Sequence, residues 1–461
     1  MVLEAIRVWL INTINWLFNS NARLLQDSSQ SSEPIVSRHV PEEKPVSLSR
    51  VTMTEIVLPS HADTRGFVFG GVVLGWIDVA AGTAAKKHAV TRSVDAVHFM
   101  HPIKVGDFLV IQASVNRAWN TSMEVGVRVE TENPLTGKKN YCCHGKRFDY
   151  SIMIIKFISN TDLCVAYLTF VALRSSQAGQ TRRRSNSPVR VPRIVTTTAI
   201  EAQRFDTAEQ RRIARISKNN SIDKNDHKND VTKMAELMRK WSERTNTETM
   251  SSAEIPPLLP DPNESDDDPA KLFLRRRKST LIKDIQQPDD KPISDSFAEV
   301  VETVLPQHAN TLQITFGGQI MQWMEQCSLI SATRHARRFL LLASIDSLQF
   351  LRPTYVGYCI TVRSMVSCTF HSSMEVYVTV EAENLMTGET FFTNDGFYTM
   401  VAVDATNIPK PVPHALIDHE EKRVICDGAV TRRKRRLQQR RELVQKEMSL
   451  SPDEFQRMSD I

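Results

Sequence analysis

An internal repeat constrains the fold of this chain more than any other feature. The stretch His61–Asp78, "HADTRGFVFGGVVLGWID", returns as His308–Glu325, "HANTLQITFGGQIMQWME". Both copies carry His-Ala followed by Asp or Asn, then Phe-Gly-Gly, then Trp and a carboxylate, at the same spacing. Self-similarity over such a distance predicts that the chain holds two copies of one structural unit.

The similarity between the copies continues beyond this stretch. The shift is 247 residues at the glycine pair and 251 after it, where these segments align: Ser93–Asp107 with Ser344–Tyr358, and Asn120–Gly137 with His371–Gly388. The four extra residues fall between a predicted helix and the next predicted strand, where a surface loop absorbs them.

The end of the first copy is interrupted. Ala166–Leu173 matches Gly396–Val403 with a shift of only 230, so the first copy holds an insertion at residues 145–165. This segment, "GKRFDYSIMIIKFISNTDLCV", is largely apolar and falls within one expected strand or hairpin arm. Two interpretations are open: a real hairpin extension, or a read-through segment absent from the working protein, which we favour.

Hydrophobic periodicity indicates the fold class. Apolar residues recur at helical spacing from Gly71 to about Ala89 and again over Gln319–Ala336. Stretches after these helices, such as "VYVTVEAE", alternate apolar and polar residues, as half-buried antiparallel strands do. One long helix packed against an antiparallel sheet is an α+β arrangement.

Shifts in composition divide the chain. We predict an N-terminal amphipathic segment and polar tail at 1–48, two domains at 49–173 and 295–404, a mostly disordered linker with short helices at 174–294, and a basic C-terminal tail at 405–461. Within the linker, Ala199–Ile216 and Val231–Thr245 have amphipathic helical patterns. The apolar stretch Val8–Phe18 is too short to span a bilayer. It is either a peripheral membrane helix or a segment that docks on the protein itself or stays poorly ordered.

Charge and cysteine content exclude several function classes. The net charge of +5 is modest, and the basic tail lacks the interleaved aromatic residues of nucleic-acid-binding modules, so we expect no nucleic-acid partner. The seven cysteines form no CxxC pair, which indicates reduced thiols in a reducing compartment. Glu4 disfavours a mitochondrial presequence, so we expect a cytoplasmic protein, with membrane association left open. We expect no metal and no cofactor, because His61 and His308 lack further ligands and are better suited to capping their loops.

The repeated motifs, with the Ser-x-Asp strand and the "SMEV" segment of each copy, resemble the acyl-CoA thioesterase family with the hotdog fold. More narrowly, they resemble the two-hotdog acyl-CoA thioester hydrolases of animal cytosol and brown fat, over about residues 50–173 and 295–404. The resemblance implies two tandem hotdog domains, each a long helix wrapped by an antiparallel sheet, that form a pseudo-dimer within one chain. It also implies hydrolysis of fatty acyl-CoA to free fatty acid and CoA. Some relatives carry a C-terminal START-type domain, but too few residues follow Asp404 for one, so we expect none in this sequence.

Two features of each copy suit thioester hydrolysis. Free N–H groups at a helix N-terminus, aided by the helix dipole, stabilise an oxyanion, and Gly71 and Gly318 stand at such positions. Asp78 and Glu325 follow about two helical turns later. A carboxylate on an apolar helix face is costly to bury, so its presence in both copies indicates a role. The alternative role is to pair with a buried arginine or a backbone group.

In the family, each active site takes the helix carboxylate from one domain and the Asn-bearing loop from the other. Carried onto this chain, the resemblance pairs Asp78 with Asn310 and Gly318 as the catalytic site. Asp78 would act as general base or nucleophile, Asn310 would orient water or substrate, and the Gly318 N–H would bind the developing oxyanion.

The second pairing joins Asp63, Glu325 and Gly71. Two carboxylates close together cannot both ionise cheaply, so one pKa should rise, and we predict a weak or silent second site. For the CoA phosphates, the candidate basic residues, each of which is alternatively plain surface charge, are Arg117, Lys138, Lys139, Arg352 and Arg363.

The family resemblance further implies a homo-oligomer, a trimer of double hotdogs. The alternative function is a non-catalytic acyl-CoA-binding sensor or scaffold that keeps the pocket and uses the linker and tail for partners.

Overall fold

The computed structural model describes residues 43–86, 88–99, 102–135, 139–141, 166–173, 187–221, 233–244 and 290–448. The predictions for the apolar N-terminal stretch, Lys138 and the insertion 145–165 lie outside the described residues. Among the described helices, none is both long enough and apolar enough to cross a bilayer.

The first domain is built around the central helix α2 and a seven-stranded antiparallel sheet, one strand of which comes from the second domain. Its elements are β1 (Glu43–Pro45), η1 (Val46–Ser49), β2 (Val51–Ile56), η2 (Pro59–His61), α2 (Gly70–Ala85), β3 (Ala89–Val94), β4 (Val97–His98), β5 (Phe108–Ala118), β6 (Ser122–Glu132), β7 (Lys139–Tyr141), β8 (Ala166–Ala172), β9 (Arg193–Val195) and α3 (Ala199–Ser221).

The second domain repeats this order around helix α6 and a six-stranded sheet. Its elements are β10 (Asp290–Pro292), η3 (Ile293–Ser296), β11 (Ala298–Thr303), η4 (Pro306–His308), α6 (Gly317–Ala336), β12 (Phe339–Ile345), β13 (Leu348–Gln349), β14 (Tyr358–Thr369), β15 (Ser373–Asn384), β16 (Glu389–Val403), β17 (His414–Leu416), η5 (Glu420–Lys422), α7 (Arg423–Cys426) and α8 (Ala429–Met448). The predicted α+β class with two tandem hotdog domains is confirmed.

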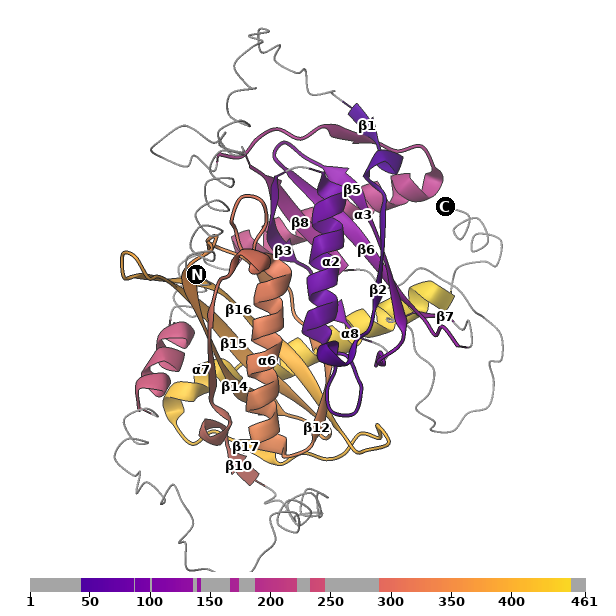
Figure 1. Ribbon diagram of the computed structural model, residues 1–461. Helices are drawn as coiled ribbons and strands as arrows, with labels where there is room; N and C mark the ends of the chain where they lie inside the picture. The colour runs from indigo at the N-terminus through magenta and orange to yellow at the C-terminus, as the bar shows by residue number, and fades with distance from the viewer. Residues whose placement is uncertain are drawn as a thin grey trace, which may run out of the picture. The chain divides into compact units, whose positions relative to one another are not determined.

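The two central helices, α2 and α6, lie side by side in front of their sheets (Figure 1). Their approach is close because glycines face the partner helix. A Cβ atom at Gly71 would lie 2.7 Å from the Gln322 Cα, and one at Gly318 would lie 2.7 Å from the Gly75 Cα. Any side chain at these positions would push the helices apart, so the glycine pair of each copy is required by the contact between domains.

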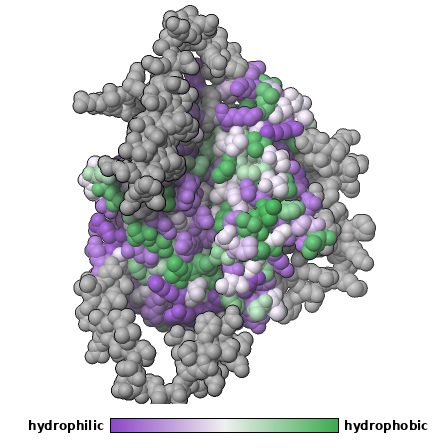
Figure 2. Space-filling view, in the orientation of Figure 1, coloured by the Kyte–Doolittle hydropathy of each residue, from purple (hydrophilic) through white to green (hydrophobic). Residues whose placement is uncertain are grey.

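The sheets also exchange short strands. β4 of the first domain pairs with β12 of the second, and β13 of the second pairs with β3 of the first. One buried apolar core therefore runs through both domains and includes Leu74, Ile77, Met321 and Met324. Over the described part of the face that carries α2 and α6, hydrophobic and hydrophilic side chains are interspersed (Figure 2).

The insertion 145–165 interrupts what is a single strand in the second domain. β15 pairs with β16 along its whole length, whereas β6 pairs first with β7 and then with β8. β7 and β8 therefore occupy the place of β16.

The duplicated unit is longer than the sequence motifs indicated. β1 pairs in parallel with β9, and β10 pairs in the same way with β17. Helices α3 and α8 then lie behind the sheets of their own domains, on the side away from α2 and α6 (Figure 1). The helix predicted at Ala199–Ile216 lies within α3, and residues 233–244 are helical within the predicted Val231–Thr245. The sequence did not indicate that residues 187–221 and 414–448 extend the two domains in equivalent ways.

Arginine–carboxylate pairs hold these outer helices in place. On α3, Arg211 lies 2.6 Å and Arg215 3.0 Å from carboxylate oxygens of the fully buried Glu124. On α8, Arg432 lies 2.7 Å from the equivalent Glu375, which Arg436 also contacts.

The Ser-x-Asp residues join the same clusters. Asp95 pairs with Arg215 at 2.9 Å and Asp346 with Arg436 at 2.6 Å. These aspartates therefore hold the outer helices, and no substrate role is needed to explain them. A buried carboxylate without such a partner would be strongly destabilising, which is why each helix carries two arginines one turn apart.

Candidate functional site

Each central helix directs a carboxylate at the N-terminus of the other central helix. The Gly318 N–H donates to Oδ2 of Asp78 at 2.9 Å. Reciprocally, the Gly70 N–H donates to Oε1 of Glu325 at 2.8 Å, and the Gly71 N–H donates to Oε2. The first turn of a helix has free N–H groups and a positive dipole end, both of which favour an anion. Each of the two sites is therefore built from both domains.

We call the first site 1, with Asp78, Thr91, Asn310, Gly317 and Gly318. Asp78 is only 2% exposed, and this burial raises its pKa above the usual value. Hydrogen bonds from the Gly318 N–H, the Thr91 hydroxyl and the Gly317 N–H oppose the rise. The Thr91 hydroxyl donates to Oδ1 at 2.7 Å. The carboxylate is thus held on both oxygens in a site that excludes water from most of its surface.

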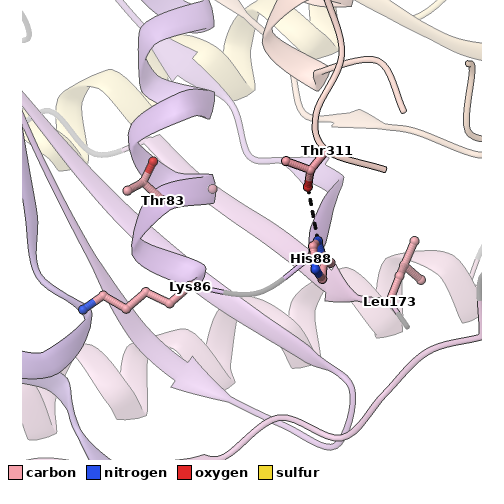
Figure 3. A pocket seen from close by; sticks show the side chains of 6 residues that line it. Thr83, Lys86, His88, Leu173 and Thr311 are labelled. Atoms are coloured by element: carbon pink, nitrogen blue, oxygen red, sulfur yellow. Dashed lines mark hydrogen bonds between the residues drawn. The ribbon is translucent and has the colours of Figure 1, made fainter. Parts of the chain in front are cut away.

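The loop that carries Asn310 reaches the first domain at strand β3. Oδ1 of Asn310 accepts hydrogen bonds from the N–H groups of Leu312 at 2.9 Å and Ile314 at 3.1 Å. Because both donors require an oxygen, the amide nitrogen must point the other way, and it lies 3.5 Å from the Ala89 carbonyl oxygen. Next to it, the His88 ring contacts the Thr311 hydroxyl at 3.2 Å across a shallow pocket (Figure 3).

Asn310 and Asp78 contact the same strand two residues apart, at Ala89 and Thr91. That separation is about 7 Å along an extended strand. No hydrogen bond joins the two side chains within the described residues. Asn310 and Asp78 therefore approach the first domain at neighbouring points of β3.

A cavity of about 300 Å³ opens beside site 1. Both domains line it: Thr91 and Val171 from the first, and Gly317, Ile320 and Phe350 from the second. Its walls are mostly apolar, with threonine and arginine side chains at intervals. Such a lining suits an apolar ligand that carries a polar head.

The equivalent residues around Glu325 form site 2, with Asp63, Arg65, Leu342, Gly70 and Gly71. Asp63 has an arginine partner that Asn310 lacks: Arg65 approaches its Oδ2 at 2.8 Å. Leu312 occupies the position of Arg65 in the second copy. The Arg65 guanidinium also lies 3.4 Å from the Leu340 carbonyl oxygen. Leu340 is the counterpart of Ala89, so Arg65 takes the place that the Asn310 amide takes at site 1.

Site 2 is also filled more completely. Leu342 replaces Thr91, and a Cβ atom on Gly70 would lie 2.5 Å from its Cδ2. Arg65 is only 10% exposed and stacks on Phe339 at 4.6 Å from the ring centroid. At the position of Thr91, site 2 has the Leu342 side chain, which carries no hydroxyl. At the position of the Asn310 amide, it has the charged Arg65 guanidinium.

Glu325 is 5% exposed, and burial raises its pKa to about 7. From the sequence, such a rise was expected from a neighbouring Asp63 carboxylate. The structure assigns it instead to loss of solvation, opposed by the N–H groups of Gly71 and Gly70. Asp63 does not contribute because its charge is compensated by Arg65.

The role predicted for Gly318 also differs from the geometry. Its N–H was assigned to the developing oxyanion, but in the structure it donates to Asp78. Gly71 similarly donates to Glu325. These amides therefore hold the carboxylates in place, because a buried anion takes up the nearest free donors.

Of the five basic residues selected for the CoA phosphates, the structure describes the side chains of three, and two of these lie away from site 1. Arg117 pairs with Glu209 of α3 at 3.1 Å, and Arg363 pairs with Glu299 and Glu381, both at 2.5 Å. Their charges are already compensated away from the cavity. Arg352 does line the cavity, although it also pairs with Glu389 at 3.1 Å. Lys138 and the side chain of Lys139 lie outside the described residues.

The loop histidines cap their turns, as predicted. His61 Nδ1 accepts the Leu58 N–H and His308 Nδ1 accepts the Leu305 N–H, both at 3.2 Å. Each ring also packs edge-on against the helix tryptophan of its copy, Trp76 or Trp323.

Three residues of the two sites were not predicted from the sequence: Thr91, Arg65 and Arg92. Of these, Thr91 and Arg92 line the cavity. A signal was available. At the positions of Arg65 and Thr91 the otherwise similar copies differ, with Leu312 and Leu342 as counterparts. Differences of this kind within a repeat mark places where the two halves have diverged.

Comparison with known proteins agrees with this architecture. A model of the thioesterase superfamily matches residues 65–138 and 312–389. A mouse protein named acyl-coenzyme A thioesterase 11 is 30% identical over 371 residues, which cover 79% of this chain and 49% of that protein. The chain therefore spans about half the length of this relative.

Two further relatives are matched over more of their length. An uncharacterized acyl-CoA thioester hydrolase of Bacillus subtilis is 34% identical over 157 residues, covering 34% of this chain and 91% of that protein. A mouse cytosolic acyl coenzyme A thioester hydrolase is 22% identical over 385 residues, covering 81% of this chain and 79% of that protein. With two hotdog domains that exchange strands and share two carboxylate sites, this chain belongs to the thioesterase superfamily.

Proposed function

We propose that the protein hydrolyses acyl-CoA thioesters at site 1. The observation that carries the proposal is the buried Asp78 carboxylate, fixed by Thr91 and Gly318, beside a cavity that both domains line. The names of the relatives supply the substrate class.

Asp78 acts on the thioester carbonyl carbon, either through a water molecule or directly. As a general base it takes a proton from the water that attacks, and a raised pKa makes it a better base near neutral pH. As a nucleophile it forms an anhydride with the acyl group, which water then cleaves. In both routes the carbon–sulfur bond breaks, the CoA sulfur recovers a proton, and a free fatty acid remains.

Asn310 binds the thioester carbonyl oxygen. Two loop N–H groups fix its Oδ1, so its amide nitrogen is presented as a donor without further reorganisation. A preorganised donor that meets developing negative charge in a buried site is an effective stabiliser of the transition state. The N-terminus of α6 adds its dipole from the same side.

Site 2 is weak or silent in this proposal. A carboxylate cannot donate to a carbonyl oxygen, so Asp63 cannot replace Asn310. Arg65 and Leu342 occupy the space and contacts that Asn310 and Thr91 have at site 1.

The acyl chain lies in the apolar part of the cavity, and Arg352 faces the CoA end. The proposed location is the cytoplasm, which the name of the cytosolic mouse relative supports. The trimer of double hotdogs that the resemblance implies would appear in light scattering as three times the 52.3 kDa mass of the chain.

The deciding experiment follows release of the CoA thiol from acyl-CoA substrates between acetyl and palmitoyl length. We expect hydrolysis by the wild type and almost none by Asp78→Asn. Binding of acyl-CoA in calorimetry without thiol release at any chain length would instead identify a non-catalytic sensor.

A further inference from the structure

Helix α8 carries a surface that neither the fold nor the proposed hydrolysis explains. We call it the basic face; its residues are Val430, Arg433, Lys434, Leu437, Arg440 and Arg441. Residues three or four positions apart lie on the same face of a helix, and this spacing joins Val430, Lys434, Leu437 and Arg441. Arg433 and Arg440 lie beside this row. All four basic residues are exposed.

The basic face is separate from the arginines that attach the helix. Arg432 and Arg436 point inward to Glu375 and Asp346. Of the outward residues, Arg433 stacks on Phe370 at 4.2 Å. Within the described part of the chain, no acidic side chain pairs with Lys434, Arg440 or Arg441. Their charges are therefore available to an external partner.

Helix α3 provides an internal control. Its inward arginines, Arg211 and Arg215, correspond to Arg432 and Arg436. Its outward positions differ: Ile213 stands in place of Lys434, and Arg212 is compensated by Glu209 at 3.5 Å. The same packing task is thus done with a nearly neutral outer face, so the fold does not require the positive charge of α8.

The combination of charge and exposed apolar side chains indicates the kind of partner. Val430 is 58% exposed and lies one turn before Arg433 and Lys434, and Leu437 is 45% exposed between these residues and Arg440 and Arg441. Nucleic acids attract such a face through charge alone. An anionic membrane surface uses both features, because the basic groups meet lipid phosphates while the apolar groups enter the boundary with the acyl chains.

We propose that the basic face of α8 docks the protein on membrane surfaces rich in anionic lipid. The docking surface lies behind the sheets, away from the central helices, so it leaves the front of both domains free (Figure 1).

The test is sedimentation of the full chain with vesicles of phosphatidylcholine, alone or with about a third phosphatidylserine. We expect binding only to the anionic vesicles, weakened by salt. Each basic residue contributes about fivefold to the affinity, so Lys434→Gln with Arg440→Gln and Arg441→Gln should lower it about a hundredfold. The control combines Arg193→Gln, Lys233→Gln and Arg239→Gln, which removes equal charge from exposed residues elsewhere and should bind as the wild type does.

A second variant separates the apolar contribution from the charge. Leu437→Gln should weaken binding without changing its salt dependence, because it removes no charge. The urea midpoint of each variant shows that it is folded. The proposal is overturned if the wild type does not bind anionic vesicles, if both triple variants bind equally, or if duplex DNA is bound and vesicles are not.

Discussion

Asp78 and Glu325 occupy the same position in two copies of one domain, yet their surroundings have diverged. Asp78 faces a threonine hydroxyl and an asparagine loop beside a cavity, whereas Glu325 faces a leucine and an Asp–Arg pair that fills the corresponding space. Both carboxylates still hold the N-terminus of the opposite helix. The comparison teaches that the contact between the domains is kept at both sites, while the surroundings of the two carboxylates are free to differ, as expected if only site 1 carries out the proposed hydrolysis.

The largest effect on hydrolysis is expected from replacing the carboxylate that acts in catalysis. Asp78→Asn should lower kcat for acyl-CoA hydrolysis by about 10²–10⁴, the usual contribution of a general base. Glu325→Gln, the matched change at the equivalent position, should leave kcat nearly unchanged at pH 8. Steady-state kinetics of both variants measure the difference, and equal losses would show that the two sites share the work.

The pKa of Glu325 should make the free energy of unfolding depend on pH. Its pKa rises from 4.5 unfolded to about 7 folded, so the folded protein keeps a proton that the unfolded chain releases. The contribution is therefore favourable at low pH and is lost as the pH rises from 4.5 to 7, by about 3 kcal/mol. Urea unfolding at a series of pH values should show this slope in the wild type. The same series with Glu325→Gln should lack it, and an unchanged slope would assign the proton to another group.

A smaller effect is expected from the hydroxyl that distinguishes the sites. Thr91→Val removes a hydrogen bond to a carboxylate, which is worth about 1.5–3 kcal/mol, so kcat should fall about tenfold or more. Because this bond lowers the pKa of Asp78, the acid limb of the pH–rate profile should also move to higher pH. Leu342→Val, on the equivalent strand of the second domain, is the control. A loss of stability with no shift in the profile would make Thr91 a packing residue only.

The smallest change in turnover is expected when site 2 of the wild type is given the residues of site 1. Asp63→Asn, Arg65→Leu and Leu342→Thr together supply the amide, open the plugged space and add the hydroxyl. They should no more than double the turnover of the wild type, since two sites would then work. The same three changes in an Asp78→Asn background are more sensitive, because any thiol release above that background must come from site 2. No gain there would mean that further positions silence it.

Much of this architecture was readable in the sequence. The Phe-Gly-Gly pairs predicted the starts of α2 and α6, and the alternating strands predicted the antiparallel sheets. The end of α6 at Ala336 was predicted correctly, but α2 was expected to run to about Ala89 and ends at Ala85, where Lys86 turns to a left-handed conformation.

The roles of charged residues were not readable in the same way. Arg117 and Arg363 look like free cations in the sequence, but each has an acidic partner far along the chain. Nor did the sequence indicate the arginine partners of Asp95 and Asp346, which are Arg215 of α3 and Arg436 of α8. Ion pairs depend on which surfaces fold together, and sequence spacing carries little information about that.

The sequence by itself determined that this protein is a duplicated α+β domain with a carboxylate two turns into each central helix, because a repeated pattern of apolar and glycine residues fixes local structure. Only the tertiary structure decided that Arg65 fills one site, that Thr91 holds Asp78 in the other, and that the linker and tail supply equivalent outer helices. These are contacts between segments distant in the chain, and they form only when both domains pack.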